Sequence, residues 1–419
     1  MNVIVKADNF GGSIEAIPSK SYAHRQLICA ALSKNSSKIK CRTVSKDITA
    51  TVECLNSLGA NIKYTNGIFD ITPVDRNNLP EKARLDVGES GSTFRFMIPI
   101  VCALGVDAEF ILHGRLPERP LTPLYEELIR NGISLSEQGS NPFCTHGKLN
   151  GKEYQIPANV SSQFISGILL ALPIIGGGSI ELLGDVQSAS YINITLECMK
   201  KAGIDISYDN NIYTVNGCYK SEKVSEVEGD WSNAAFWLCA GAIAKEPVTV
   251  TGLNMDSSQG DKKVIEVLKR FGGRVFIEKD KITTSCAQLN GIDIDASDIP
   301  DLIPVLSVVA ACASGKTQVY NAGRLRIKES DRIESTCDIL NKLGVKTEQT
   351  KDSMTIYGSE TLKSCTVDGW NDHRIAMMAA ISSVAVLGTV IIKDAHCVNK
   401  SYPDFFKDFD ILNGVVEEE

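Results

Sequence analysis

The sequence predicts an α/β (α+β) protein of two similar domains, each built from three β-α-β-α-β-β repeats. Three observations support this prediction. The chain has 419 residues, which is too long for one ordinary core and favours two domains of about 200 residues each. A helix-ending glycine recurs at a nearly constant interval, and a series of capped, apolar helices recurs in phase with it.

The glycine series defines the repeat. Each member follows a helical stretch and precedes a segment that is suited to a strand. The six are Gly59, Gly132, Gly203, Gly272, Gly344 and Gly414, and successive members are 69 to 73 residues apart. A glycine at this position is typical of a helix that ends in a left-handed residue. Six such units indicate six copies of one supersecondary module.

The second series consists of polar or small caps that lead into nearly all-apolar helices. The caps lie at 19–21, 88–92, 161–163, 230–233, 298–301 and 371–373, and the apolar stretches at 27–32, 94–104, 164–172, 234–244, 302–313 and 374–387. Helices that are apolar on nearly all sides are buried. Segments that alternate or are rich in β-branched residues, such as 67–71 and 248–250, supply the strands.

The domain boundaries follow from three repeats per domain. The charged stretch 222–228 suggests a linker. We therefore expect a first domain at 12–228 and a second at 1–11 plus 229–419. In this scheme the first strand pairs with the second half, and the Gly11-Gly12 pair opens a second connection between the halves.

Composition excludes several classes of function. The net charge of −8 argues against nucleic acid as the main partner. The first residues resemble a strand rather than a signal peptide, and no apolar run reaches the ~18 residues of a membrane helix, so we expect a cytoplasmic protein. The thirteen cysteines show no C-x-x-C pair, which favours free thiols. The five histidines lack metal-ligand spacing. We expect no metal and no cofactor.

Cations stand on the caps of several predicted helices. Lys20, Arg25, Arg95 and Arg374 lie near helix starts, where positive charge opposes the helix dipole and is usually avoided. Six helices entering a cleft with one polarity would present their N-termini to an anion. Taken singly, each cap could merely satisfy a helix end and each arginine could be a solvated surface residue. Their repetition favours an anion-binding site.

Seven segments, in order, resemble one family. They are Lys20–Arg25, Gly88–Arg95, Glu118–Pro120, Ser161–Gln163, Arg326–Arg332, Asn371–Arg374 and Lys400–Asp404. Together they resemble the EPSP synthase family of enolpyruvyl transferases over about residues 6 to 410. The resemblance implies the enolpyruvyl transferase fold, an inside-out α/β barrel in each domain, with the active site in the interdomain cleft. It also implies transfer of the enolpyruvyl group of phosphoenolpyruvate to the 5-hydroxyl of shikimate 3-phosphate, in aromatic amino acid biosynthesis.

The resemblance also implies residue roles. The phosphoenolpyruvate set is Lys20, Gly91, Arg95, Arg119, Gln163, Arg332, Arg374 and Lys400. The shikimate 3-phosphate set is Lys20, Ser21, Arg25, Ser161, Ser162, Gln163, Ser188, Tyr191, Asp301, Arg324 and Lys328. The catalytic candidates are Asp301, Glu329 and Lys20. Asp301 is a candidate base for the attacking oxygen and Glu329 handles the proton at C3, but which group serves which step stays open. By its position alone, Asp301 could simply be a first-turn acid that the helix dipole favours.

Some residues depart from the family pattern. Glu89 stands where asparagine is common, Ser92 where threonine is usual and Arg324 where some members have asparagine. A carboxylate at position 89 would repel phosphoenolpyruvate unless it turns away or pairs with a cation. Gly91 leaves room for the herbicide glyphosate in the family, so we expect sensitivity.

Two other functions are considered. The related transferase that acts on UDP-N-acetylglucosamine has a Lys-Asn pair in its first motif and a cysteine in its mobile loop. This chain instead has Lys20-Ser21 in that motif and no cysteine in the loop 112–121. A non-catalytic scaffold that binds anionic metabolites would need neither Asp301 nor Glu329. We expect small anionic substrates, no nucleic-acid or membrane partner, and a monomer.

Overall fold

The structure, a computed structural model, describes residues 2–220 and 222–418. The chain divides into two compact units, which we describe separately. The first unit is 18–227 and the second unit is 1–17 with 228–419. Residues 12–17, which we expected to open the first domain, belong to the second unit because strand β2 (Gly12–Glu15) pairs in parallel with β15 (Val248–Thr251).

The first unit contains three copies of the predicted module, in which each sheet has four strands. The first copy is β14 (Val224–Glu226), α1 (Lys20–Ala31), β3 (Ser37–Lys40), α2 (Lys46–Ser57), β4 (Asn61–Thr65) and β5 (Ile68–Thr72). The second is β6 (Lys82–Asp86), α3 (Gly91–Leu104), β7 (Asp107–Ile111), α4 (Leu124–Arg130), β8 (Ser134–Leu135) and β9 (Phe143–His146). The third is β10 (Glu153–Pro157), α5 (Ser162–Ala171), β11 (Gly178–Leu183), α6 (Ala189–Lys201), β12 (Asp205–Asp209) and β13 (Ile212–Asn216).

The second unit repeats this plan. Its first copy is β2, α7 (Trp231–Ile243), β15, α8 (Val264–Phe271), β16 (Arg274–Glu278) and β17 (Lys281–Ser285). Its second is β18 (Asp293–Asp295), α9 (Ile303–Ala311), β19 (Lys316–Tyr320), α10 (Arg332–Lys342), β20 (Thr347–Gln349) and β21 (Met354–Tyr357). Its third is β22 (Cys365–Asp368), α11 (His373–Ser382), β23 (Val390–Lys393), α12 (Phe405–Ile411), β24 (Val415–Glu418) and β1 (Val3–Lys6). The predicted repeat is therefore confirmed.

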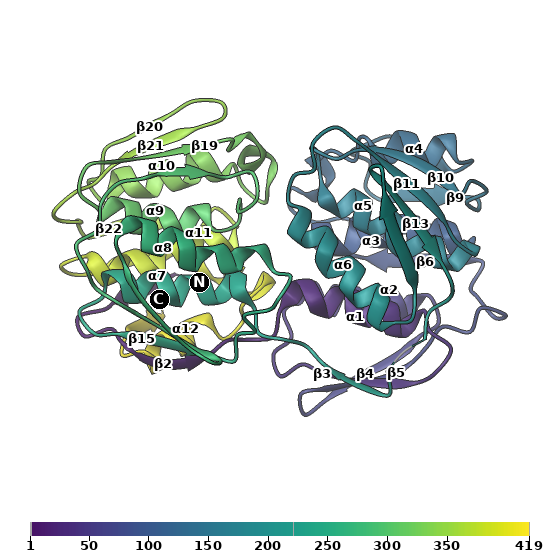
Figure 1. The fold of residues 1–419 in the computed structure, drawn as a ribbon, viewed down its shortest axis with the longest axis horizontal. Helices are drawn as coiled ribbons and strands as arrows, with labels where there is room; N and C mark the ends of the chain where they lie inside the picture. The colour runs from purple at the N-terminus through teal and green to yellow at the C-terminus, as the bar shows by residue number, and fades with distance from the viewer. Residues whose placement is uncertain (1, 221, 419) are drawn as a thin grey trace. The chain divides into compact units, whose positions relative to one another are not determined.

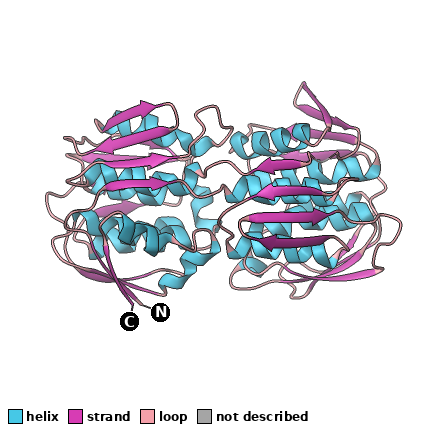
Figure 2. Ribbon diagram, turned by 90° about the horizontal axis from the view of Figure 1, so that it is seen from below, coloured by secondary structure: helices cyan, strands magenta, loops and turns pink. Residues whose placement is uncertain are grey.

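Every described sheet has the same pairing pattern. Two strands run parallel, and two more add in antiparallel orientation, as in the order β6-β7-β9-β8. In the last sheet β1 takes the place of the antiparallel strand beside β23, with Val3 opposite Ile392, and β24 adds to its other edge. The two ends of the chain consequently lie side by side (Figure 2).

The helices form the inside of each unit and the sheets form its outside (Figures 1 and 2). Of α3 every residue except Ser92 is buried, and all ten residues of α11 are buried. The strands instead alternate buried and exposed residues, as β6 does, because one face packs on the helices and the other meets solvent. Among the described residues no helix combines the length and the apolar character that crossing a bilayer requires.

Three local predictions need correction. Five of the six glycines are left-handed, with φ between 76° and 100°, but at the sixth helix end Asn413 takes that conformation with φ of 61°. Gly414 is instead required because a Cβ there would run into Phe409. The predicted cap 298–301 does not begin α9, which starts at Ile303. The last apolar helix was expected to reach 387 but ends at Ser382. At this end the hydroxyls of Ser382 and Ser383 donate to backbone carbonyls one turn earlier in the helix.

Candidate active site

In the first unit two arginines converge on the N-terminus of α3. A Cβ placed on Gly91 would lie 2.6 Å from Nη1 of Arg119 and 2.7 Å from Nη1 of Arg95. Nε of Arg119 is buried and has no hydrogen-bond partner among the described residues. Two guanidinium groups above a helix N-terminus make a strongly positive site. Such a site is suited to a carboxylate or a phosphate.

Gln163 connects this pair of arginines to α5. Its Oε1 accepts a hydrogen bond from Nη1 of Arg95 at 2.9 Å, and its Nε2 donates to Oγ of Ser92 at 2.9 Å. Ser161 caps α5 by accepting from the backbone N of Gln163 at 3.3 Å, and Ser162 is the first residue of the helix. The N-termini of α3 and α5 are thus joined through one side chain.

Arg25 organises the candidate acceptor residues. This buried guanidinium donates to the carbonyls of Ser21 at 2.8 Å and Tyr191 at 3.1 Å, and its Nε donates to Oγ1 of Thr195 at 2.6 Å. Burial lowers the pKa of Arg25 to about 10, so it stays charged at neutral pH. Ser188, at the start of α6, is buried and has a left-handed φ of 54°. Strained backbone of this kind is frequent at functional sites.

Lys20 does not stand alone at the start of α1. Its Nζ forms an ion pair with Oδ2 of Asp47 at 2.8 Å, and both side chains are mostly buried. Asp47 lies in the first turn of α2, where its charge favours the helix dipole. We did not predict this acid. The ion pair with Asp47 holds the Lys20 ammonium group in place.

In the second unit one arginine collects three carboxylates. Arg332, with a side chain 1% exposed, bonds Asp372 through Nε at 2.8 Å, Asp301 through Nη1 at 2.7 Å and Glu329 through Nη2 at 2.7 Å. The charges of Asp372, Glu329 and Asp301 raise the pKa of Arg332 against the effect of burial. Asp372 also caps α11 by accepting from the backbone N of Arg374 at 3.0 Å.

Asp301 is the common partner of the cations here. Besides Arg332, it meets Nη2 of Arg374 at 3.3 Å and Nζ of Lys328 at 3.6 Å. Burial lowers the pKa of Lys328 to about 8. The negative charge of Asp301 opposes this shift, and the positive charge of Arg324 increases it. Asp301 is therefore bound to a cluster of cations, which is a different environment from the helix start that the sequence suggested.

Lys400 occupies a second position in this unit. Its Nζ donates to the backbone carbonyl of Asn371 at 2.6 Å and to Oδ1 of the same residue at 2.8 Å. Asn371 has a left-handed φ of 47° and lies two residues before the start of α11. Lys400 is thereby placed next to the helix that carries Arg374.

Asp261 is a further acid that the sequence analysis missed. It is buried, and burial together with the negative charge of Asp301 raises its pKa to about 6, while Arg374 opposes the shift. No motif marks it, because a single acid in a Gln-Gly-Asp turn is common in loops. The interaction of Asp261 with Asp301 becomes visible only in the fold, which packs this turn close to Asp301.

The structure also answers the question about Glu89. Its carboxylate fills the space in which a Cβ on Gly114 would lie, so Glu89 turns toward the loop 112–121. That loop carries Arg115 and Arg119. Ser92, the other departure in this segment, retains a hydroxyl and bonds Gln163.

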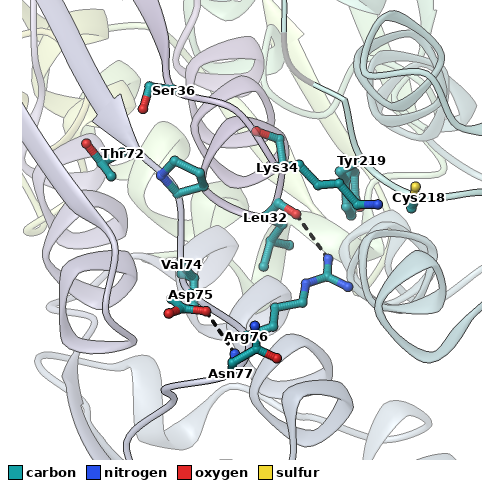
Figure 3. Close-up of a pocket in the computed structure, with 12 residues that line it drawn as sticks. Leu32, Lys34, Ser36, Thr72, Val74, Asp75, Arg76, Asn77, Cys218 and Tyr219 are labelled. Atoms are coloured by element: carbon teal, nitrogen blue, oxygen red, sulfur yellow. Dashed lines mark hydrogen bonds between the residues drawn. The ribbon is translucent and has the colours of Figure 1, made fainter.

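The described contacts join some of the predicted site residues within each unit. In the first unit they join Arg95, Arg119 and Gln163, and separately Arg25 with Ser21 and Tyr191. In the second unit they join Asp301, Lys328, Glu329, Arg332 and Arg374. A separate cavity of about 490 Å³ lies elsewhere in the first unit (Figure 3). It is formed around Leu32, at the end of α1, and Arg76, whose Nη2 donates to the Leu32 carbonyl at 3.0 Å. Lys20 lies at the opposite end of this helix, which at 12 residues is ~18 Å long. Among the described residues no group of histidines, cysteines and acids could hold a metal.

The arrangement of six β-α-β-α-β-β modules in two units is that of the enolpyruvyl transferases. An EPSP synthase structure from Acinetobacter baumannii matches the whole chain with a TM-score of 0.83 and 25% identity, over 100% of both chains. The enolpyruvyl transferase NikO from Streptomyces tendae shares the fold, with a TM-score of 0.78 at 17% identity.

Sequence relatives narrow the class. The 3-phosphoshikimate 1-carboxyvinyltransferase of Clostridium kluyveri is 40% identical over 99% of this chain and 98% of its own length. That of Clostridium perfringens strain 13 is 41% identical over 100% and 99%. The model of the EPSP synthase (3-phosphoshikimate 1-carboxyvinyltransferase) family matches residues 4–409. The chain belongs to the EPSP synthase family, which confirms the resemblance seen in its motifs.

Proposed function

We propose that this chain transfers the enolpyruvyl group of phosphoenolpyruvate to the 5-hydroxyl of shikimate 3-phosphate and releases phosphate. Family membership gives the class of enzyme and its reaction. The observation that supports the substrates is the convergence of Arg95 and Arg119 on Gly91. Two forked cations at one helix start suit a small ligand that carries both a carboxylate and a phosphate.

The proposed phosphoenolpyruvate residues divide between the units. Arg95, Arg119, Gly91, Gln163 and Lys20 lie in the first, and Arg332, Arg374 and Lys400 in the second. We assign both groups to the same pair of substrates. The proposed acceptor residues are divided in the same way. Those in the first unit are Lys20, Ser21, Arg25, Ser161, Ser162, Gln163, Ser188 and Tyr191, and those in the second are Asp301, Arg324 and Lys328.

The reaction has two stages. The acceptor's 5-oxygen bonds to C2 of phosphoenolpyruvate and loses its proton, while C3 gains a proton and becomes a methyl group. The C2–O bond to phosphate then breaks as C3 loses a proton. In the proposed scheme Asp301 receives the hydroxyl proton, and Glu329 or Lys20 exchanges the proton at C3.

The ion pairs of Arg332 fit these roles. Its contacts to Asp301 and Glu329 hold both carboxylates in fixed positions. An incoming anion would compete for the guanidinium and would release one of them. A carboxylate that leaves its arginine becomes more basic. In the proposed scheme, binding of the donor thus frees the base for the first step.

Oligomeric state, location, cofactors and partners are also part of the proposal. We propose a monomer that works in the cytoplasm, without metal or cofactor and without nucleic-acid or membrane partners. The net charge of −8 supports the absence of a nucleic-acid partner. Sedimentation of the purified chain would test the monomer directly.

Substitution of the two acids tests the catalytic proposal. Asp301→Asn and Glu329→Gln preserve shape but cannot accept a proton. We expect each to bind phosphoenolpyruvate and shikimate 3-phosphate in calorimetry and to lose at least about a hundredfold in turnover. A scaffold that only binds metabolites would bind both ligands and show no turnover even in the wild type. Unchanged turnover in both variants would contradict the proposed roles.

A further inference from the structure

The loop that carries Arg119 is exposed along most of its length. The loop follows β7 and precedes α4. Within 112–121 only Leu112, Leu116 and Leu121 are buried. Three buried leucines give the loop limited packing, so polar contacts must contribute to its position.

Two side-chain amides hold the ends of this loop. At its start, Oδ1 of Asn141 accepts from the backbone N of Leu112 at 3.0 Å, and Nδ2 donates to the Leu112 carbonyl at 2.7 Å. At its end, Oε1 of Gln138 accepts from the backbone N of Leu121 at 3.0 Å, and Nε2 donates to Oγ1 of Thr122 at 2.9 Å. Both amides come from the turn between β8 and β9 of the same module.

The contact at the end of the loop is next to the arginine site. Leu121 lies two residues after Arg119, and the carbonyl of Pro120 between them accepts from Nη2 of Arg95 at 3.3 Å. The Pro120 carbonyl and the Leu121 N–H belong to one peptide group, so Gln138 holds the same peptide that Arg95 contacts. Because both amides are neutral, they act on the position of Arg119 and leave the charge of the site unchanged.

We propose that Gln138 and Asn141 are positioning residues that hold the loop 112–121 so that Arg119 is placed to bind the phosphoenolpyruvate anion. The proposal rests on the proposed function of the Arg95–Arg119 site. The hydrogen bonds described for the two amides go to Leu112, Leu121 and Thr122. They act through the backbone of Leu112 and Leu121.

The test compares the KM for phosphoenolpyruvate, the donor substrate, with the KM for shikimate 3-phosphate, the acceptor substrate. In Gln138→Ala and Asn141→Ala we expect the KM for phosphoenolpyruvate to rise about tenfold, which corresponds to a loss of about 1.4 kcal/mol. The KM for shikimate 3-phosphate should stay within about twofold, because its proposed residues do not include Arg119 and are linked to this loop only indirectly, through Gln163 and Arg95. Gln138→Glu keeps the acceptor for the Leu121 amide, so hydrogen exchange at that amide should stay as slow as in the wild type.

A matched control and a second measurement separate positioning from stability. Gln155→Ala removes an exposed amide in the neighbouring module, where Nε2 donates to Glu181 at 2.7 Å, and should leave both KM values unchanged. Hydrogen exchange should become faster at the Leu121 amide in Gln138→Ala and at the Leu112 amide in Asn141→Ala.

Three results would overturn the proposal: unchanged donor KM in both alanine variants, an equal rise in both KM values, or unchanged exchange at the two amides. A wild-type chain without turnover would instead count against the proposed function. In that case exchange, together with calorimetric binding of phosphoenolpyruvate to the variants, still decides whether the amides position the loop.

Discussion

Arg332 and Asp372 form a two-point ion pair inside the second unit, with Nε to Oδ2 at 2.8 Å and Nη2 to Oδ1 at 3.2 Å. Their side chains are 1% and 0% exposed. Asp372 also caps α11 at the backbone N of Arg374. One buried carboxylate thus sets the positions of two arginines in the proposed donor site.

Removing this guanidinium should cost both stability and activity. Arg332→Met would leave Asp372 buried without its cation, and we expect a loss of about 3–5 kcal/mol in the free energy of unfolding. Phosphate release should fall to background. Lys342→Met is the control on the same helix, because its exposed pair with Asp338 contributes only about 0.5 kcal/mol. Denaturant unfolding of both variants checks the expectation, and equal losses would contradict it.

Gly91→Ala should weaken donor binding without weakening the fold. The added methyl group would meet the guanidinium groups of Arg95 and Arg119, which must then move apart. The backbone of Gly91 is not left-handed, so alanine brings no strain and suits the helix. We expect a KM for phosphoenolpyruvate about tenfold higher at an unchanged melting temperature.

The same position bears on glyphosate. We expect the wild type to be inhibited, and Gly91→Ala to need more of the compound for equal inhibition, because the space above Gly91 is filled. Inhibition curves at a phosphoenolpyruvate concentration equal to each KM measure this. No inhibition of the wild type far above that concentration would reject the prediction.

Acceptor affinity should depend on pH through Lys328. Burial lowers the pKa of this lysine to about 8, so its positive charge is present below pH 8 and is lost above it. If Lys328 binds the anionic acceptor, the KM for shikimate 3-phosphate should rise as the pH passes from 7 to 9. In Lys328→Arg the charge persists and the rise should disappear. A KM that rises equally in both proteins would contradict the assignment.

Asp261 should lower stability above pH 6. Its pKa is raised from 3.8 to about 6 by burial and by Asp301, so the folded state keeps a proton that the unfolded state releases between pH 4 and 6. Stability from this group therefore falls as the pH rises through that window, by up to about 3 kcal/mol. Asp261→Asn should melt higher than the wild type at pH 7.5 and equally at pH 4. A difference independent of pH would contradict this account.

Sequence periodicity predicted the architecture because the repeat is local. Each helix-ending glycine and each capped apolar helix is encoded within about 20 residues, and copies at a constant interval reinforce one another. The exception shows the limit of the pattern. At the last helix end a glycine is present, but Asn413 takes the left-handed conformation, since Gly414 is needed for its closeness to Phe409.

The partners of the site residues could not be predicted in this way. Lys20 and Asp47 are 27 residues apart, and Arg332 and Asp372 are 40 apart, so only the packing of helices brings them together. Asp301 appeared to be a helix-start acid, whereas the fold places it against Arg332 and Arg374. The cations were visible in the sequence because they broke a local rule, but the acids that neutralise them broke none.

Release of inorganic phosphate tests the central claim most directly. Purified protein would be given phosphoenolpyruvate and shikimate 3-phosphate, together and separately. The account predicts release only when both are present, because phosphate leaves after the acceptor oxygen has bonded to C2. No release with that pair would contradict it. Release with UDP-N-acetylglucosamine as acceptor would then identify the related transferase, and no release with either acceptor would favour a binding scaffold.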